Sequence, residues 1–141
     1  MTQEDKELLL KDLCARLPYG VKMNHIANNV NEPTTLIGIV KDMITLEGNG
    51  GYSTANVEEF KPYLFPMSSM TEEQKRELKD LISQQTNILI EQLKNDDCGI
   101  DSGKYHFHST LELEWVLKNH FDFNGLIPKG LALDATGLGI Y

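Results

Sequence analysis

The sequence predicts an α+β fold. A small antiparallel sheet or an SH3-like partial barrel, over about residues 20–66, is flanked by an N-terminal helix and by C-terminal helices. Apolar residues recur at helical spacing at the start of the chain, short β-branched runs alternate with Gly and Asn turns in the middle, and a helix-capping signal follows at residue 71. So short a β region makes a thin core, and we therefore expect the helices to pack on the sheet.

The first predicted element is a helix over residues 1–17. Thr2 can cap this helix, with Asp5 at the third helical position. Pro18 and Gly20 end it. One apolar stripe is formed by leucines that recur every fourth residue, at Leu9, Leu13 and Leu17.

The middle of the chain has the composition of short strands. Its β-branched and apolar runs are residues 21–27, 35–40, 43–46 and 57–65. Breaks rich in Gly, Asn and Asp separate these runs. The glycine-rich break at residues 48–51 lacks the Lys and the following helix of a phosphate-binding loop, so we interpret it as a hairpin loop.

The second half of the chain predicts two helices and a glycine-punctuated tail. Thr71, with a glutamine three residues later, forms a capping box at the start of a helix over residues 71–94. A further helix is expected within residues 105–141, followed from His120 by a tail in which glycines alternate with Leu and Ile. Such a tail is too apolar to stay solvated, so it should lie extended against the fold or bind another molecule. We predict a single domain over residues 1–141.

The formal net charge is −8, from 13 Lys and Arg against 21 Asp and Glu. The acidic excess is spread over both halves of the chain, so the total hides no basic segment. This distribution argues against sequence-independent binding of nucleic acid, in which Lys and Arg replace phosphate counterions.

The sequence predicts a cytoplasmic protein that does not enter a membrane. Its start is acidic and polar, whereas a secretory signal needs a basic region followed by an apolar run. Its apolar runs are only a few residues long, far below the roughly 20 that span a bilayer. Cys14 and Cys98 match no metal or redox spacing, which favours a reducing compartment.

Candidate metal ligands gather late in the chain: Cys98, Asp101, His106, His108 and His120. On a strand, His106 and His108 would point to one face, and Cys98 or His120 could supply a third ligand for zinc or iron. The spacing matches no established site, and aromatic residues interleave with the two histidines. The competing interpretation is therefore the polar face of a half-buried segment, and we predict no cofactor.

His120, Asp122 and Asn124 alternate with two phenylalanines, a pattern typical of a half-buried strand. A carboxylate can orient an imidazole for catalysis, but residues two apart on one strand seldom form that hydrogen bond, and no nucleophile is near. Asp122 or Asn124 could instead close a side-chain turn before Gly125. We therefore assign no catalytic residue.

Four aromatic residues of the β region could form a base-stacking platform: Tyr52, Phe60, Tyr63 and Phe65. Few lysines accompany them, and Glu58 and Glu59 lie in the same predicted strand. Packing of these aromatic rings in the core is the favoured interpretation.

Three stretches of the chain resemble an uncharacterised family of small proteins encoded by gut Bacteroidales and by their phages and mobile elements. They are LCARLPYGVK (residues 13–22), KPYLFPMSSMTEEQ (61–74) and HFDFNGLIPKGLALD (120–134). The resemblance implies a cytoplasmic protein of a bacterial or phage-infected cell. It implies no activity, cofactor or catalytic residue.

Three functions remain open at this point. The favoured one is a non-enzymatic accessory protein of a phage or mobile element, which binds a protein partner or itself through the sheet edge, the apolar residues 88–93 or the tail at 126–140. The second is a nucleic-acid-associated small β-barrel. The third is a metal-dependent enzyme built on His106, His108 and His120.

Overall fold

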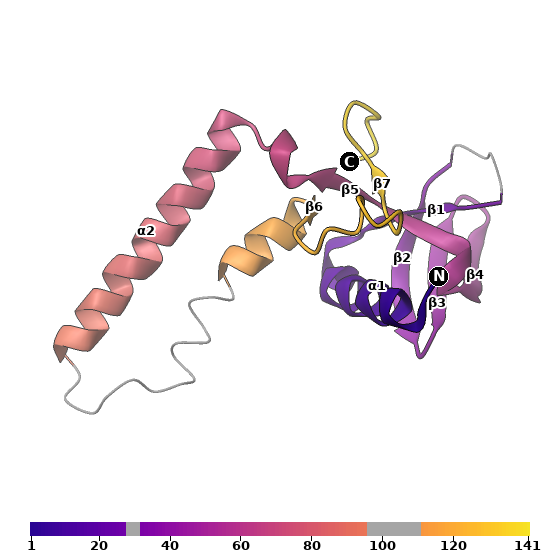
Figure 1. Ribbon diagram of the computed structural model, residues 1–141, viewed down its shortest axis with the longest axis horizontal. Helices are drawn as coiled ribbons and strands as arrows, with labels where there is room; N and C mark the ends of the chain where they lie inside the picture. The colour runs from indigo at the N-terminus through magenta and orange to yellow at the C-terminus, as the bar shows by residue number, and fades with distance from the viewer. Residues whose placement is uncertain (28–31, 96–110) are drawn as a thin grey trace. The chain divides into compact units, whose positions relative to one another are not determined.

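A computed structural model describes residues 1–27, 32–95 and 111–141, without the side chains of residues 85–95. The chain forms two compact units, one made of residues 1–69 and 120–141 and the other of residues 70–119. The first unit holds helix α1 and a sheet, and the second holds helix α2 and a helical stretch at 111–118 (Figure 1). The predicted α+β class is confirmed.

The sheet contains seven strands within the described residues: β1 (Lys22–His25), β2 (Thr34–Val40), β3 (Met43–Gly48), β4 (Gly51–Asn56), β5 (Phe60–Pro66), β6 (Phe121–Asp122) and β7 (Leu133–Asp134). Their order is β4-β3-β2-β1-β5-β6, with β7 also paired to β5. The first five strands pair antiparallel, whereas β6 and β7 run parallel to β5.

The sheet is therefore open and mixed, and the small-barrel alternative is wrong. In the described part of the chain, β4 forms one edge and the short strands β6 and β7 form the other. Closure of a barrel would require these two edges to pair with each other. Instead, the apolar tail returns to β5 and extends the sheet.

Helix α1 (Gln3–Arg16) begins and ends where its sequence predicts. The Thr2 hydroxyl accepts a hydrogen bond from the Asp5 amide at 3.1 Å, and a 3-10 turn at Leu17–Tyr19 leads to Gly20, whose φ of 66° is left-handed. Leu9 and Leu13 of the apolar stripe are fully buried in the core with the sheet, and Leu17 is partly buried against it. The fully buried Leu, Ile and Met side chains of this core are Leu9, Leu13, Met23, Leu36, Ile44, Leu46, Leu64 and Leu126.

Two hairpins with two-residue loops build the sheet from β2 to β4. Lys41 and Asp42 join β2 to β3, and the predicted hairpin loop at Asn49 and Gly50 joins β3 to β4. Strand β4 was not among the predicted strands. Its polar sequence shows no apolar alternation because much of the strand is exposed on both faces.

The predicted capping box starts helix α2 (Glu72–Asn95) in the second unit. The Gln74 amide donates to the Thr71 hydroxyl at 3.2 Å, and the Gln74 side chain accepts from the Thr71 amide at 2.9 Å. The indole of Trp115, in the helical stretch at 111–118, donates to Glu77 at 3.4 Å and so links the two helices of this unit. No helix among the described residues is long and apolar enough to cross a bilayer.

The glycine-punctuated tail contributes four buried residues to the first unit. Leu126, Leu131, Ala132 and Ala135 are each 5% exposed or less. The Ala135 amide donates to the Leu64 carbonyl at 2.8 Å. This part of the tail is therefore not a free docking segment. The other predicted apolar surface, at residues 88–93, is not among the side chains that the structure describes.

Candidate functional site

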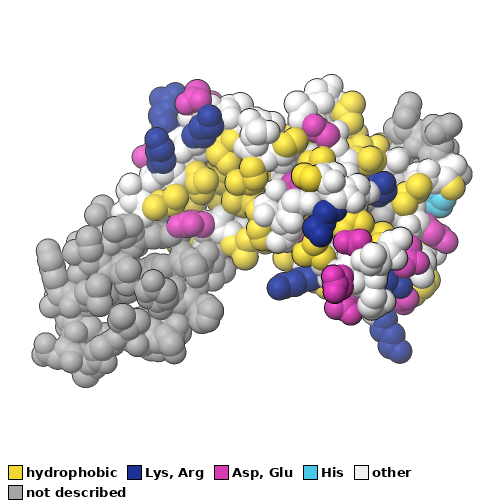
Figure 2. Space-filling view, viewed as in Figure 1, with side chains coloured by type: hydrophobic (Ala, Val, Ile, Leu, Met, Phe, Trp, Pro, Cys, Tyr) yellow, Lys and Arg dark blue, Asp and Glu magenta, His cyan; other side chains and the backbone are white. Residues whose placement is uncertain are grey.

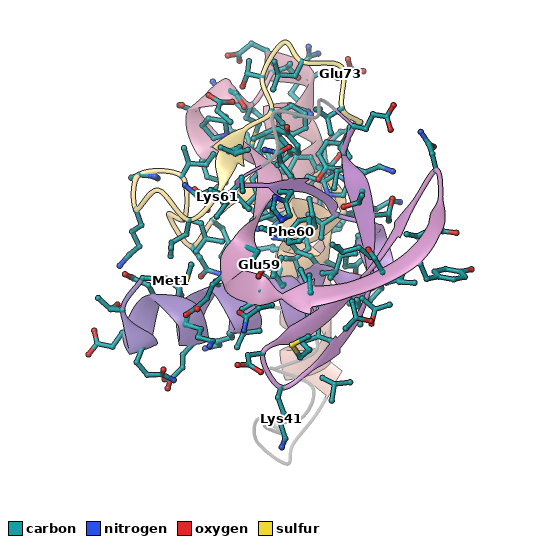
Figure 3. All side chains as sticks on the ribbon, turned by 90° about the vertical axis from the view of Figure 1, so that its right-hand side faces the viewer. Met1, Lys41, Glu59, Phe60, Lys61 and Glu73 are labelled. Carbon is teal, nitrogen blue, oxygen red and sulfur yellow. The ribbon has the colours of Figure 1, made fainter. Side chains whose placement is uncertain are left out.

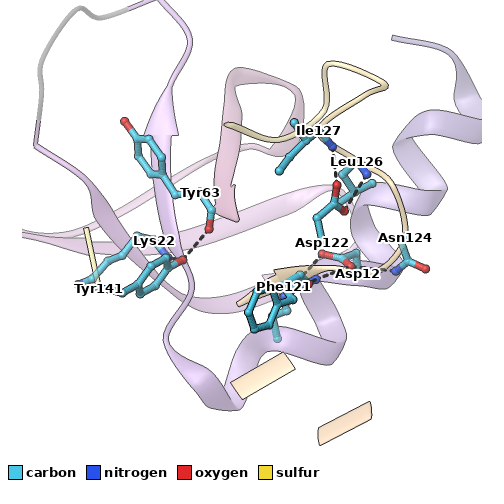
Figure 4. A network of polar contacts seen from close by, with 10 residues as sticks. Asp12, Lys22, Tyr63, Phe121, Asp122, Asn124, Leu126, Ile127 and Tyr141 are labelled. Atoms are coloured by element: carbon cyan, nitrogen blue, oxygen red, sulfur yellow. Dashed lines mark hydrogen bonds and ion pairs between the residues drawn. The ribbon is translucent and has the colours of Figure 1, made fainter. Parts of the chain in front are cut away.

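A buried ion pair joins helix α1 to strand β6 (Figure 4). Arg16 and Asp12 lie one helical turn apart, and Arg16 Nε donates to Asp12 Oδ2 at 2.6 Å. Arg16 Nη2 donates to the backbone carbonyl of Phe121 at 2.7 Å. Asn124 Nδ2 donates to Asp12 Oδ1 at 2.9 Å. Both charged side chains are fully excluded from water, so the pair depends on these added hydrogen bonds.

Asp122 closes the turn that follows β6. Its two carboxylate oxygens accept hydrogen bonds from the Leu126 and Ile127 amides, each at 2.8 Å. A side-chain turn at this position was one of the interpretations of Asp122 from the sequence. The carboxylate satisfies two backbone amides, one of them buried, and does not orient the His120 imidazole, whose Nδ1 has no partner.

His120 lies at the entrance to β6 with a left-handed φ of 60°. Its side chain stacks on Tyr141, with ring centroids 3.7 Å apart and planes 13° apart. Burial lowers the pKa of His120 from 6.5 to about 4, and the nearby Arg16 charge adds to this effect. The imidazole is therefore neutral at pH 7.

The Tyr141 hydroxyl replaces a hydrogen bond of the β1–β5 ladder. Met23 pairs with Pro62, so the next antiparallel pair would be Lys22 with Tyr63. Instead, the Lys22 amide donates to the Tyr141 hydroxyl at 2.9 Å, and that hydroxyl donates to the Tyr63 carbonyl at 2.8 Å. Burial raises the pKa of Tyr141 to about 12, so this bridge persists at ordinary pH.

These contacts form the fastener of the tail, by which we mean Asp12, Arg16, His120, Asp122 and Tyr141. The polar groups of Asp12, Asp122 and Tyr141 bond to backbone atoms, to Arg16 or to Asn124, whereas Arg16 Nη1 and His120 Nδ1 are buried without a partner. The predicted alternation is not observed at β6, since His120, Phe121 and Asp122 are all buried, while Phe123 is 40% exposed. These residues have a structural role, because their contacts hold the tail against α1 and β5.

The predicted metal ligands cannot be assembled from the described residues. Cys98, Asp101, His106 and His108 lie outside them, and His120 is part of the fastener. Within the described residues, no three His, Cys, Asp or Glu side chains gather in a way that could hold a metal ion.

A hollow of about 260 Å³ lies where β1 and β5 meet the β3–β4 loop, and nothing in the sequence pointed to it. Its lining residues are His25, Glu32, Pro33, Thr34, Gly48, Asn49 and Phe60. The imidazole of His25 packs edge-on against Phe60 and accepts a hydrogen bond from the Ala27 amide. Glu32 accepts from Asn49 at 3.3 Å. These polar groups already have partners within the chain.

The aromatic residues of the β region do not form a stacking platform. Phe60 points into the core at 7% exposure, as predicted, and lies within the body of the first unit in Figure 3. Tyr52 is 74% exposed on β4, contrary to the expectation of core packing. Its position on an edge strand with its side chain directed away from α1 explains this difference.

The remaining distinctive surface is the β4 edge, by which we mean strand β4 and the outward side chains of its neighbours. In the described part of the chain, β4 pairs only with β3. Pairing places Met43 beside Val40 on β2 and beside Asn56 on β4. Val40 is 71% exposed and Met43 is 39% exposed, and Lys41 projects from the tip of the hairpin between them (Figure 3).

Charged side chains of both signs are interspersed on the visible face of the first unit (Figure 2). Two ion pairs form at Lys6, whose Nζ lies 3.2 Å from Asp42 Oδ2 and 3.6 Å from Glu58 Oε1. Comparisons of the chain with protein-family models, with curated proteins and with solved structures found no match.

Proposed function

We propose that this protein is a non-enzymatic accessory protein that binds another polypeptide by accepting it as an additional strand beside β4. The observation that supports this proposal is the open edge of β4, where the sheet ends without a covering strand in the described residues. Strand addition of this kind derives its affinity from main-chain hydrogen bonds and its specificity from flanking side chains.

The hairpin fixes which groups of β4 are available. Gly48 pairs with Gly51 across a two-residue loop. Residues that flank such a loop exchange hydrogen bonds, and bonded and non-bonded pairs then alternate along the ladder. The N–H and C=O groups that point away from β3 therefore belong to every second residue: Tyr52, Thr54 and Asn56.

The β4 edge lacks the features by which sheet edges are usually protected. Strand β4 (Gly51–Asn56) contains neither proline nor a charged residue. Its six residues pair with β3 without a register shift, so no bulge turns the edge away. Edge strands that must stay unpaired usually carry lysine, proline or a bulge.

The side chains around β4 fit a polypeptide partner better than a nucleic acid. Exposed Tyr52, Val40 and Met43 offer apolar contacts on the outward face. The net charge of −8 disfavours a phosphate backbone, and the open sheet removes the barrel on which that alternative depended. A bacterial or phage cytoplasm, implied by the sequence resemblance, is the setting we propose.

Proline substitution at Thr54 tests the proposed function. Thr54→Pro removes an N–H group that faces away from β3, so it should block strand addition and keep the β3–β4 ladder. Thr54→Val retains the N–H and serves as the matched control. Each variant would be used to capture proteins from the cells that encode it, with circular dichroism to confirm the fold.

We expect the wild type and Thr54→Val to retain the same partner and Thr54→Pro to lose it. Equal recovery of every captured protein with all three baits would contradict binding at the β4 edge. Retention of DNA or RNA in place of a protein, weakening with added salt, would favour the nucleic-acid alternative.

A further inference from the structure

We infer that the strand added to β4 is β4 of a second copy of this chain, so that the protein self-associates about a two-fold axis through Thr54. This inference rests on the proposed function and names its partner. Two-fold dimers are the commonest protein assemblies, and they require a surface that is complementary to itself.

The register follows from the pattern of free backbone groups. In an antiparallel pair, residues that face each other point to the same side of the sheet. The free groups of β4 belong to Tyr52, Thr54 and Asn56. All three are used only when Thr54 faces Thr54 and Tyr52 faces Asn56 of the other copy. Each of the three facing pairs then exchanges its two hydrogen bonds.

The side chains on the outward face match in this register. Thr45 pairs with Thr54 within one chain, so a continuous row of four threonines crosses the axis. Facing threonine pairs stabilise antiparallel strands. No ionisable side chain lies in this row, so its formation brings no like charges together.

A second row on the same face of the sheet contains the exposed apolar residues Val40 and Met43. Val40, Met43 and Asn56 lie side by side on β2, β3 and β4 of one chain. Across the axis, Tyr52 of the second copy would follow Asn56 and extend this row. The carboxylate of Glu47 lies on the far side of that tyrosine. Tyr52, which is 74% exposed in the single chain, would be partly covered in the dimer.

The contact is short, and this sets the expected affinity. One six-residue edge buries less surface than the roughly 1,200 Å² or more of a stable interface, so the dimer should dissociate on dilution. Sedimentation equilibrium of the purified wild-type chain should show a reversible monomer–dimer equilibrium.

Opposite charges placed on the axis test the register. Thr54→Lys and Thr54→Glu each place like charges face to face, which should raise the dissociation constant roughly tenfold or more. An equimolar mixture of the two variants should restore the dimer, because Lys then faces Glu. Thr54→Val should dimerise like the wild type. Thr54 is exposed, so all three variants should fold.

A wild-type chain that stays monomeric at roughly millimolar concentration would overturn self-pairing. So would a mixture of Thr54→Lys and Thr54→Glu that remains monomeric. Loss of a captured protein from Thr54→Pro would still support the proposed function in either case, with a different polypeptide as the added strand. Failure of both experiments would remove both proposals.

Discussion

The two edges of the sheet differ in what the chain has placed on them. At the edge beyond β5, here called the β5 edge, the tail contributes β6 and β7, the Phe121 carbonyl that accepts from Arg16 of α1, and the Tyr141 bridge. At the β4 edge, the described residues contribute no further strand. Buried polar groups hold the tail at one edge, whereas strand β4 at the other edge contains no charged residue and no proline.

This difference separates structural from binding roles. Polar residues at the β5 edge are buried and mostly satisfied within the chain, so changing them should alter stability. Backbone groups at the β4 edge face outward, so changing them should alter association with little effect on stability. The four changes below test the structural side of this comparison, in order of decreasing effect.

Arg16→Met should have the largest effect, because it leaves the Asp12 carboxylate buried without its counter-charge. We expect a loss of about 3–5 kcal/mol in the free energy of unfolding, measured by urea denaturation. The double variant Asp12→Leu with Arg16→Met is the control, and it should recover most of the loss because no charge remains buried. A single variant as stable as the wild type would contradict the role of this pair.

Acidification should destabilise the β5 edge through His120. Its pKa is 6.5 when unfolded and about 4 when folded, so between these values the unfolded chain binds more protons. Stability should therefore fall as the pH drops from about 6.5 to about 4, by roughly 3 kcal/mol from this residue. Unfolding free energies measured across this range provide the test.

His120→Asn is the matched control for the pH effect. Asparagine tolerates the left-handed φ of 60° at this position and has no group that titrates between pH 4 and 7. The pH dependence of the wild type should exceed that of the variant. Parallel curves for the two proteins would mean that His120 is not the group responsible.

Asp122→Ala should destabilise the turn after β6. The Leu126 and Ile127 amides lose their acceptor, and the expected loss is about 1–3 kcal/mol. Asp122→Asn keeps one acceptor oxygen and should lose less. Limited proteolysis should cleave residues 123–130 faster in the alanine variant, whereas unchanged cleavage would argue against this turn as a fastener.

Tyr141→Phe should have the smallest effect, about 1 kcal/mol. It removes the hydroxyl between Lys22 and Tyr63 but keeps the ring against His120. Hydrogen exchange of the Lys22 amide should accelerate more than that of the Leu36 amide, which donates to the Val21 carbonyl. Equal acceleration of both amides would indicate a general loss of stability in place of a local bridge.

Much of the fold was predictable because its determinants are close together in the sequence. The caps at Thr2 and Thr71 each act on a residue three positions later. The runs at residues 35–40 and 43–46 gave β2 and β3 within two residues of their ends. Strand β4 was missed because an edge strand that is exposed on both faces has no apolar period to detect.

The site was less predictable than the fold. His120 and Asp122 were identified as chemically interesting residues, but their roles as a buried stacking partner and a turn acceptor depend on Tyr141 and on the Leu126 and Ile127 amides. The importance of Arg16 was not foreseen, since an arginine on a helix next to an apolar stripe is usually a solvated residue.

The sequence by itself determined the class of fold, the helix starts and the hairpin loops, because these depend on hydrogen bonds and periodicities within a few residues. Only the tertiary structure decided which edge of the sheet the tail would cover. That choice depends on contacts such as Arg16 with Phe121, which are 105 residues apart, and on the space that α1 and β5 leave for Leu126. The open β4 edge is the other result of that choice.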